Sequence, residues 1–352
     1  MIIRSKAPLR LGLAGGGTDV SPYSDDFGGA VLNATLNLYS YCSIEKNQSK
    51  TIVFNMSDRG IIKKFPLASK LPYDGEFDLL IGVYNRICKD YNNNAPLSIS
   101  VTTQSDAPGG SGLGTSSTMV VAILTAYVEL LKIPLGEYDI AQLAFDIERN
   151  DIGLKGGKQD QYAAAFGGFN FMEFHSDNKV IINPLRVKNW IIDELQESMI
   201  LYYTGTSRDS GTIINEQIKS AINKEARSLQ ALHELKAMAI KMKEALLKGE
   251  INEIANLLKK SWLEKKKTSN VVTNSLIDDV YNVAIKAGAV AGKVSGAGGG
   301  GFMMLLVDPN KKQDVIRALK QFGGRIEKFS FSKYGATSWS VEKNKTCIKD
   351  GE

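Results

Sequence analysis

The segment PGGSGLGTSS, from Pro108 to Ser117, constrains this chain more than any other part of its sequence. Its glycines let the backbone turn tightly and bring amide groups close to an anion, which a Cβ atom would obstruct. The helix-like run TMVVAILTAYVELLK follows directly. A helix start favours negative charge, because its N–H groups are unsatisfied and its dipole is positive there. We therefore predict a phosphate-binding loop leading into a helix, made of Pro108, Gly109, Gly110, Ser111, Gly112, Leu113, Gly114, Thr115, Ser116 and Ser117.

This loop is not a Walker A motif, although Gly109 and Gly114 have the spacing of that motif. Thr115 occupies the position where a Walker A motif requires lysine. The positive charge that phosphate needs must therefore come from a metal ion or from elsewhere in the chain. The alternative interpretation is a Gly/Ser turn that only caps a buried helix.

A second glycine run, KVSGAGGGGF, extends from Lys293 to Phe302 and contains G-x-G-x-x-G at Gly296, Gly298 and Gly301. A Rossmann fingerprint would lead from a strand into a helix, but the apolar run FMMLLVD that follows has no helical polar face. We predict strand, glycine turn, strand, with the backbone at Gly296 and Gly298 open to a substrate. A purely structural glycine-rich hairpin is the alternative.

The third segment is APLRLGLAGGGTDV, from Ala7 to Val20. With Ala7-Pro8-x-Arg10 leading to Thr18-Asp19, the three segments occur in the order found in GHMP kinases, which include galactokinases, homoserine kinases and mevalonate kinases. The chain resembles this family from residue 2 to about residue 340. The resemblance implies an ATP-dependent kinase with a two-lobed α+β fold and an active site in the cleft between the lobes. We expect an N-terminal domain of residues 1–190 and a C-terminal domain of residues 191–352.

The resemblance also implies a Mg²⁺ site at Ser116 and Glu148. Two oxygen ligands, completed by phosphate oxygens and water, suit a hard octahedral cation. Phosphoryl transfer depends on alignment and charge neutralisation more than on covalent chemistry, so such a cation is expected. The alternative for Glu148 is a solvated helix face.

Asp160, in GLKGGKQDQYAAAFGG, corresponds in the resemblance to the catalytic aspartate of the family. A carboxylate there can accept the proton of the substrate hydroxyl. Arg10 corresponds to the arginine that galactokinases place beside their aspartate. A guanidinium cannot act as a base, so its expected role is to stabilise the alkoxide and the transferred group. The alternatives are a structural aspartate and a solvent-facing arginine.

One departure from the galactokinase pattern bears on the acceptor. Gly16-Gly17 precede Thr18-Asp19, where galactokinases have Glu-His. Losing a carboxylate and a ring makes room for a sugar with an anionic tail, while Asp19 corresponds to the aspartate that binds sugar hydroxyls. Cationic partners of a phosphate on that tail are then expected, and the candidates are Arg208, Lys155 and Lys158. The alternative for Arg208 is an ordinary loop arginine.

Together, LAGGGTDVSPY and GGKQDQYAAAFGGFNF resemble the bacterial heptose 7-phosphate kinases within the family. The implied reaction phosphorylates the anomeric oxygen of D-glycero-D-manno-heptose 7-phosphate and gives a 1,7-bisphosphate for surface-glycan synthesis. Two alternatives remain: a kinase of a free sugar such as fucose, and a non-catalytic sensor of sugar and ATP. A sensor would be expected to have lost Asp160 or Glu148, and both are intact.

The overall composition fits a protein that binds small anionic substrates. The 43 basic and 38 acidic residues are interspersed and give a net charge of +5, so we expect no nucleic-acid partner. From three scattered cysteines we expect a reducing cytoplasm, and from the strand-like start MIIRSKAP we expect no signal peptide. The longest charge-free stretch is broken by glycines and serines, so no membrane span is expected. The oligomeric state stays open, a homo-oligomer included.

Apolar residues at spacings of three and four predict a long helical region over residues 211–270. Within it, KKSWLEKKK at Lys259 to Lys267 reads as a solvated helix face with a buried edge, rather than as a nucleic-acid patch. After it, the second glycine run, a helix over residues 311–322 and the strand-like runs FSFS and SWSVEK are expected to form one small α+β unit.

Overall fold

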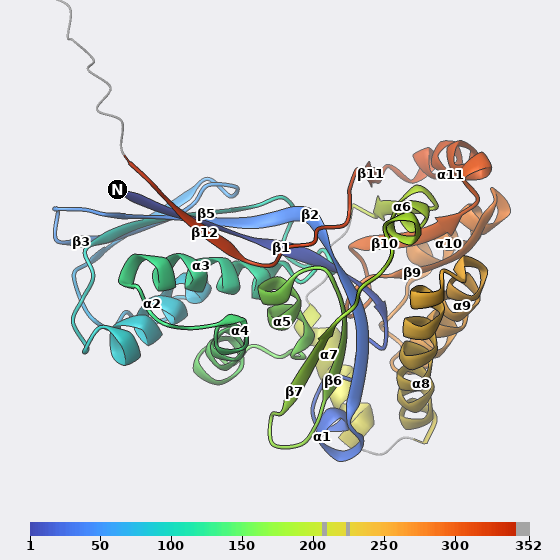
Figure 1. The fold of residues 1–352 in the computed structure, drawn as a ribbon, viewed down its shortest axis with the longest axis horizontal. Coiled ribbons are helices and arrows are strands. Elements are labelled where there is room, and N and C mark those ends of the chain that lie inside the picture. Colours follow the sequence, from blue (N-terminus) through green and yellow to red (C-terminus); the bar gives the residue numbers. More distant parts are fainter. Residues whose placement is uncertain (206–209, 223–225, 343–352) are drawn as a thin grey trace, which may run out of the picture.

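The structure is a computed structural model that describes residues 1–205, 210–222 and 226–342. Within them the chain forms two sheets flanked by helices, which confirms the predicted α+β class (Figure 1). The larger sheet has eight strands in the order β12-β1-β2-β5-β3-β4, with β6 paired to β2 and β7 paired to β6. Its strands are β1 (Ile2–Ala14), β2 (Gly29–Lys46), β3 (Thr51–Met56), β4 (Ile61–Pro66), β5 (Ile99–Ser105), β6 (Phe169–Phe174), β7 (Val180–Pro184) and β12 (Thr337–Val341).

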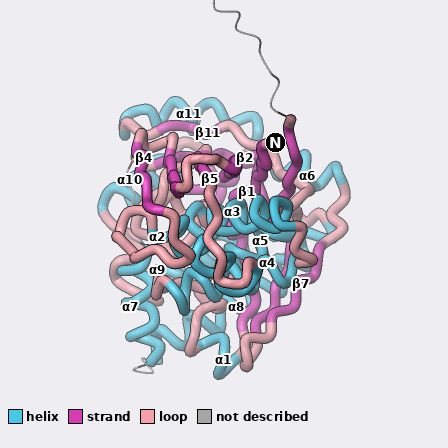
Figure 2. Tube along the Cα trace, turned by 90° about the vertical axis from the view of Figure 1, so that its left-hand side faces the viewer, coloured by secondary structure: helices cyan, strands magenta, loops and turns pink. Residues whose placement is uncertain are grey.

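Helices cover one face of this sheet, as Figures 1 and 2 show. They are α2 (Asp78–Tyr91), α3 (Thr115–Leu131), α4 (Glu137–Asp146), the π-helical turn η1 (Ile147–Asp151) and α5 (Gln159–Phe166), while the short α1 (Tyr23–Phe27) lies at the far end of β2. Helix α3 packs on both β1 and β2 and is apolar around most of its circumference. A helix of that kind must be buried on all sides, and α2, α4 and α5 complete its burial.

The smaller sheet has four strands in the order β11-β8-β10-β9, all antiparallel. Its strands are β8 (Met199–Tyr203), β9 (Ala289–Val294), β10 (Phe302–Val307) and β11 (Arg325–Glu327). Its helices are α6 (Asn189–Glu197), α7 (Ser210–Ile222), α8 (Ala226–Lys248), α9 (Ile251–Lys267), α10 (Ser275–Lys286) and α11 (Lys312–Leu319), with the 3-10 turns η2 (Pro309–Lys311) and η3 (Lys320–Phe322). One apolar core lies between α8, α9 and both sheets, and a second lies under α10 and α11.

Several local predictions are confirmed. A helix begins at Thr115, three helices span most of residues 211–270, and the second glycine run joins two antiparallel strands, β9 and β10. The placement of SWSVEK in the small C-terminal unit is wrong. Strand β12 pairs instead with β1 in the larger sheet, with Ile3 opposite Ser340. A short run of alternating residues does not specify its partner strand, because pairing is decided by the tertiary fold.

Strand β2 joins the two halves of the larger sheet. Its first residues pair with β6 and its last residues pair with β5, while β1 follows it along most of its length. The β1–β2 register shifts between Pro8 and Arg10. An irregularity of this kind changes the direction of the residues beside it. Here the backbone amide of Arg10 donates to the oxygen of Leu113 at 3.0 Å. No helix among the described residues is long and apolar enough to cross a membrane.

Candidate active site

The three segments singled out in the sequence meet at one place. The amide of Arg10 donates to Leu113, and the amide of Phe302 donates to the oxygen of Ser111 at 2.8 Å. A Cβ atom on Gly112 would lie 2.4 Å from the oxygen of Ser295, and one on Gly301 would lie 2.2 Å from the oxygen of Ser111. The two glycine loops therefore pack backbone against backbone, which any side chain would prevent.

The first loop ends at an uncapped helix. Gly110, Gly112 and Gly114 have φ angles of 71°, 81° and 76°, a region that favours glycine. Gly114 is the N-cap of α3, no side chain caps that helix, and its first turn contains no acidic residue. The first amide groups of α3 are thus left for an external acceptor, in the geometry that binds phosphate.

A cavity of about 440 Å³ opens beside this loop and extends to α5, α7 and α9. Most of the residues predicted from the sequence line it: Arg10, Gly17, Asp19, Gly109, Gly110, Gly112, Gly114, Thr115, Ser116, Ser117, Glu148, Asp160 and Gly296. Lys155 lines it as well. Pro108, Ser111 and Leu113 belong to the loop without lining the cavity, and both Ser111 and Leu113 are fully buried beneath it.

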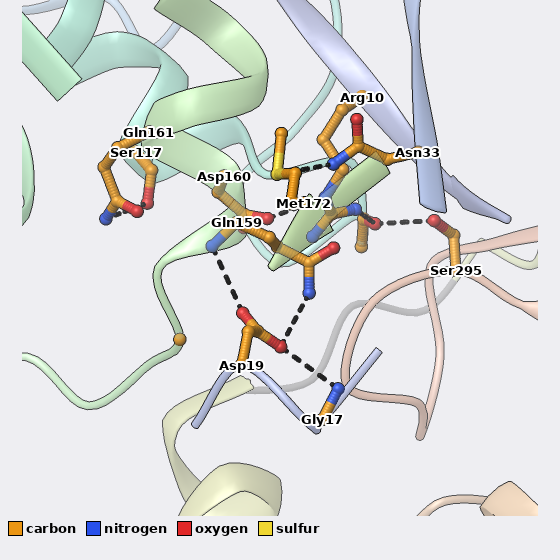
Figure 3. Close-up of polar contacts among 12 residues, drawn as sticks. Arg10, Gly17, Asp19, Asn33, Ser117, Gln159, Asp160, Gln161, Met172 and Ser295 are labelled. Atoms are coloured by element: carbon orange, nitrogen blue, oxygen red, sulfur yellow. Dashed lines mark hydrogen bonds and ion pairs between the residues drawn. The ribbon is translucent and has the colours of Figure 1, made fainter. Parts of the chain in front are cut away.

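Asp160 and Arg10 form an ion pair inside this cavity. Arg10 Nε donates to Asp160 Oδ1 at 2.7 Å, and its Nη1 donates to the oxygen of Gly112 at 2.5 Å (Figure 3). Ser295 Oγ donates to the same oxygen at 2.8 Å. Arg10 is only 4% exposed, whereas the Asp160 side chain is 22% exposed. The arginine therefore holds one carboxylate oxygen, and the other faces Gly114, whose Cβ position lies 3.1 Å from Oδ2.

Glu148 lies beside Ser116, which is in the first turn of α3. Ser116 Oγ donates to Glu148 Oε1 at 3.0 Å, and Gln161 Nε2 donates to Oε2 at 2.5 Å. Glu148 is 1% exposed and lies in the π-helical turn η1, a kind of turn found frequently at functional sites. The solvated-face alternative for Glu148 is therefore wrong.

This oxygen pair fits a hard cation such as Mg²⁺. Among the described residues, no group of three or more His, Cys, Asp or Glu side chains could hold a metal. A cation bound at Ser116 and Glu148 would therefore complete its shell with phosphate oxygens and water, the mode that Mg²⁺ usually adopts in nucleotide sites.

Asp19 is fixed by α5 and by its own loop. Its carboxylate accepts from the Gly17 amide at 3.2 Å, from the Gln159 amide at 3.2 Å and from Gln159 Nε2 at 3.1 Å (Figure 3). A Cβ on Gly157 would lie 1.9 Å from Oδ2, so only glycine lets the segment before α5 approach this closely. The acceptor groups on Asp19 are therefore pre-positioned at the cavity wall.

Five predicted substrate residues lie away from the cavity wall or outside the described residues. Thr18 is fully buried and bonds to Gly15 and Ala30. Gly16 contributes only its oxygen, which accepts from Lys265, and Gly298 packs against Val272. Lys158 is 3% exposed and turns toward Asp25 and the ring of Phe145, because it directly precedes α5. Arg208 lies outside the described residues.

Two buried lysines near Arg10 were missed by sequence reasoning. Lys265 lines the cavity, and Lys293 donates weakly to the oxygen of Leu13 at 3.5 Å. Burial lowers the pKa of Lys265 to about 8, which nearby Asp19 partly opposes. Burial, and then the charges of Lys265 and Arg10, lower the pKa of Lys293 to about 7. Lys265 lies in the lysine run KKSWLEKKK, and Lys293 begins the second glycine run. The position of Lys265 near Trp262 on one helix was the available signal that it could be buried.

A second cavity, of about 170 Å³, adjoins the first on the other side of the loop. The two cavities share Gly109, Thr115 and Ser116. The remaining wall of the second combines apolar side chains of Met56, Phe77, Leu79, Leu80, Ala107 and Met119 with polar ones that include Asp58, Arg59 and Glu76. A flat apolar group attached to the phosphates held by the loop would fit there.

Comparisons with known proteins agree with this arrangement. Models of the N-terminal and C-terminal GHMP kinase domains match residues 78–168 and 242–325. The chain is 48% identical to a D-glycero-alpha-D-manno-heptose 7-phosphate kinase of Campylobacter jejuni, covering 96% of this chain and 99% of that protein. It is 27% identical to an L-fucokinase/L-fucose-1-P guanylyltransferase of Bacteroides fragilis, over 91% of this chain and 36% of that protein.

Solved structures also match over almost the whole chain. A D-glycero-D-manno-heptose 1-phosphate kinase from Bacteroides thetaiotaomicron is 50% identical, with a TM-score of 0.83 and coverage of 97% of this chain and 100% of that one. Full-length similarity at this level agrees with the three motifs that meet in the cavity. The chain is an ATP-dependent kinase that belongs to the GHMP kinase family.

Proposed function

We propose that this kinase transfers the γ-phosphoryl group of ATP to O1 of D-glycero-D-manno-heptose 7-phosphate, giving the 1,7-bisphosphate. The observation that carries the chemistry is the Arg10–Asp160 pair facing the uncapped start of α3 in one cavity. The full-length similarity to heptose phosphate kinases supports the sugar. The first of these relatives is named a kinase of heptose 7-phosphate and the second a kinase of heptose 1-phosphate. We choose heptose 7-phosphate as the substrate because its anomeric hydroxyl, which is the most acidic hydroxyl of such a sugar, is free to be phosphorylated.

The two adjoining cavities support one orientation of ATP. The adenine ring would occupy the second cavity beside Met56 and Met119, and the phosphates would lie over the loop and the start of α3. Ser116 and Glu148 would hold Mg²⁺. When bound, that ion neutralises the charge of the phosphates during transfer.

Asp160 then has the position of the general base. Arg10 holds Oδ1, and Oδ2 accepts no hydrogen bond from any of the described residues, so Oδ2 can accept the proton of the O1 hydroxyl as that oxygen attacks phosphorus. Arg10 keeps the carboxylate in place and adds positive charge beside the developing alkoxide. Asp19 would accept hydrogen bonds from other hydroxyl groups of the sugar, while Lys155 and Arg149 on the cavity wall, together with Arg208, are the proposed partners of the 7-phosphate.

Turnover with a panel of acceptors tests this proposal. The purified protein is assayed with ATP and Mg²⁺ against heptose 7-phosphate, mannose 6-phosphate, fucose, galactose and mevalonate. We expect kcat/KM for heptose 7-phosphate to exceed the others by at least about 100-fold, since a phosphate left unpaired or a cationic site left empty costs several kcal/mol. Preference for a free sugar would overturn the 7-phosphate assignment, and ATP binding without any turnover would favour a sensor.

A further inference from the structure

Lys265 is a buried cation on the acceptor side of the cavity, and nothing in the reaction described above uses it. It extends from α9 and is 4% exposed, but it contributes to the cavity wall. Its Nζ donates to the oxygen of Gly16 at 3.0 Å. Among the described residues this is the one hydrogen bond that the ammonium group makes. Two of its three N–H groups are therefore left for a ligand.

Asp19 lies close to this ammonium group without touching it. The two charges attract each other, but they form no ion pair at or below 4.0 Å among the described residues. The Asp19 carboxylate is held by Gly17 and Gln159, so it does not swing toward the lysine. The Gly16 oxygen that accepts from Lys265 and the Gly17 amide that donates to Asp19 belong to the same peptide group, so the two side chains flank one point of the loop. Both groups line the cavity, so an oxygen atom of the acceptor can reach that place.

The chemistry of the pair selects one kind of oxygen. A hydroxyl group donates its proton to a carboxylate and accepts a hydrogen bond from an ammonium group at the same time. A phosphate has no proton to give at neutral pH and would be repelled by Asp19. The gap between Lys265 and Asp19 therefore suits a sugar hydroxyl and disfavours the phosphate of the acceptor.

We propose that Lys265 is a specificity-determining residue of the acceptor site, which together with Asp19 recognises one hydroxyl group of the sugar. The proposal rests on the proposed function only in requiring that the acceptor be a polyhydroxylated sugar. Lys293 does not line the cavity, although it is close enough to Lys265 for the charge of Lys265 to lower its pKa.

Lys265→Met tests the role, with Lys267→Met as the matched control. Methionine keeps the length and apolar stem of the lysine, and Lys267 lies two residues further along α9 with its ammonium group exposed and paired with Glu264. For Lys265→Met we expect kcat/KM for the sugar to fall about 10- to 100-fold with KM for ATP unchanged, as for a lost charged hydrogen bond. Lys267→Met should stay within about twofold of the unchanged protein. Equal activity of the two variants would overturn the proposal.

Acceptors that lack single hydroxyl groups separate recognition from a structural role. For one deoxy sugar, we expect a 10- to 100-fold loss with the unchanged protein and almost no additional loss with Lys265→Met, because the same bond is removed in both cases. Losses that add for every deoxy sugar would overturn the proposal. The series is built on whichever sugar the panel identifies, so a preference for another sugar would refute the heptose assignment and still test the lysine. If turnover is lost, acceptor binding by calorimetry gives the same comparison.

Discussion

Lys293→Met is expected to make the protein more stable, by an amount that depends on pH. Burial and two neighbouring cations lower the pKa of Lys293 from 10.5 to about 7. The folded state therefore binds fewer protons than the unfolded state between about pH 7 and pH 10.5, so the lysine destabilises the fold at low pH and this cost disappears as the pH rises. At about 1.4 kcal/mol per pKa unit, the cost is about 4–5 kcal/mol at pH 6.5 and about 1 kcal/mol at pH 9.5.

Urea unfolding of both proteins at these two pH values measures the effect. Methionine keeps the length and apolar stem of the lysine and gives up the weak bond to Leu13. We expect the variant to be more stable by about 3–5 kcal/mol at pH 6.5 and by no more than about 1 kcal/mol at pH 9.5. A variant that is less stable at both pH values, or a gain that does not change with pH, would refute the assignment of Lys293 as a buried, destabilising cation.

Four further outcomes follow from the site. Asp160→Asn should retain ATP binding measured by calorimetry but lose about 10²- to 10⁴-fold in kcat, and near-normal turnover would remove Asp160 from the mechanism. Glu148→Gln should raise the Mg²⁺ concentration needed for half-maximal rate about tenfold or more, which a Mg²⁺ titration of the rate would detect. Gly112→Ala should lower the thermal midpoint by several degrees, corresponding to about 2 kcal/mol or more, because its Cβ would meet the oxygen of Ser295 at 2.4 Å and its φ is 81°. KM for the sugar should rise as the pH increases through about 8, where Lys265 loses its charge, and a flat profile in that range would contradict its role.

The sequence predicts those parts of the site that depend on the conformation of a short backbone segment. Gly112 and Gly301 mark the close approach of two loops of the chain, which no other residue allows, and the helix start at Thr115 follows from composition. Lys265 and Lys293 could not be found in this way, because their burial depends on how α9 packs against β9 and β1. The same limit applies to β12, whose pairing with β1 is decided by the tertiary fold. Lys158 was a candidate by charge alone, and the fold turned its side chain toward Asp25.

The position of the transferred phosphate decides whether this kinase acts on O1 of heptose 7-phosphate. The protein is incubated with ATP, Mg²⁺ and heptose 7-phosphate, and the product is examined by phosphorus NMR, with proton coupling to locate the new ester. We expect a second phosphate coupled to the anomeric proton, absent with Asp160→Asn. A new phosphate on any other oxygen, or an unchanged spectrum from protein that binds ATP, would contradict that expectation.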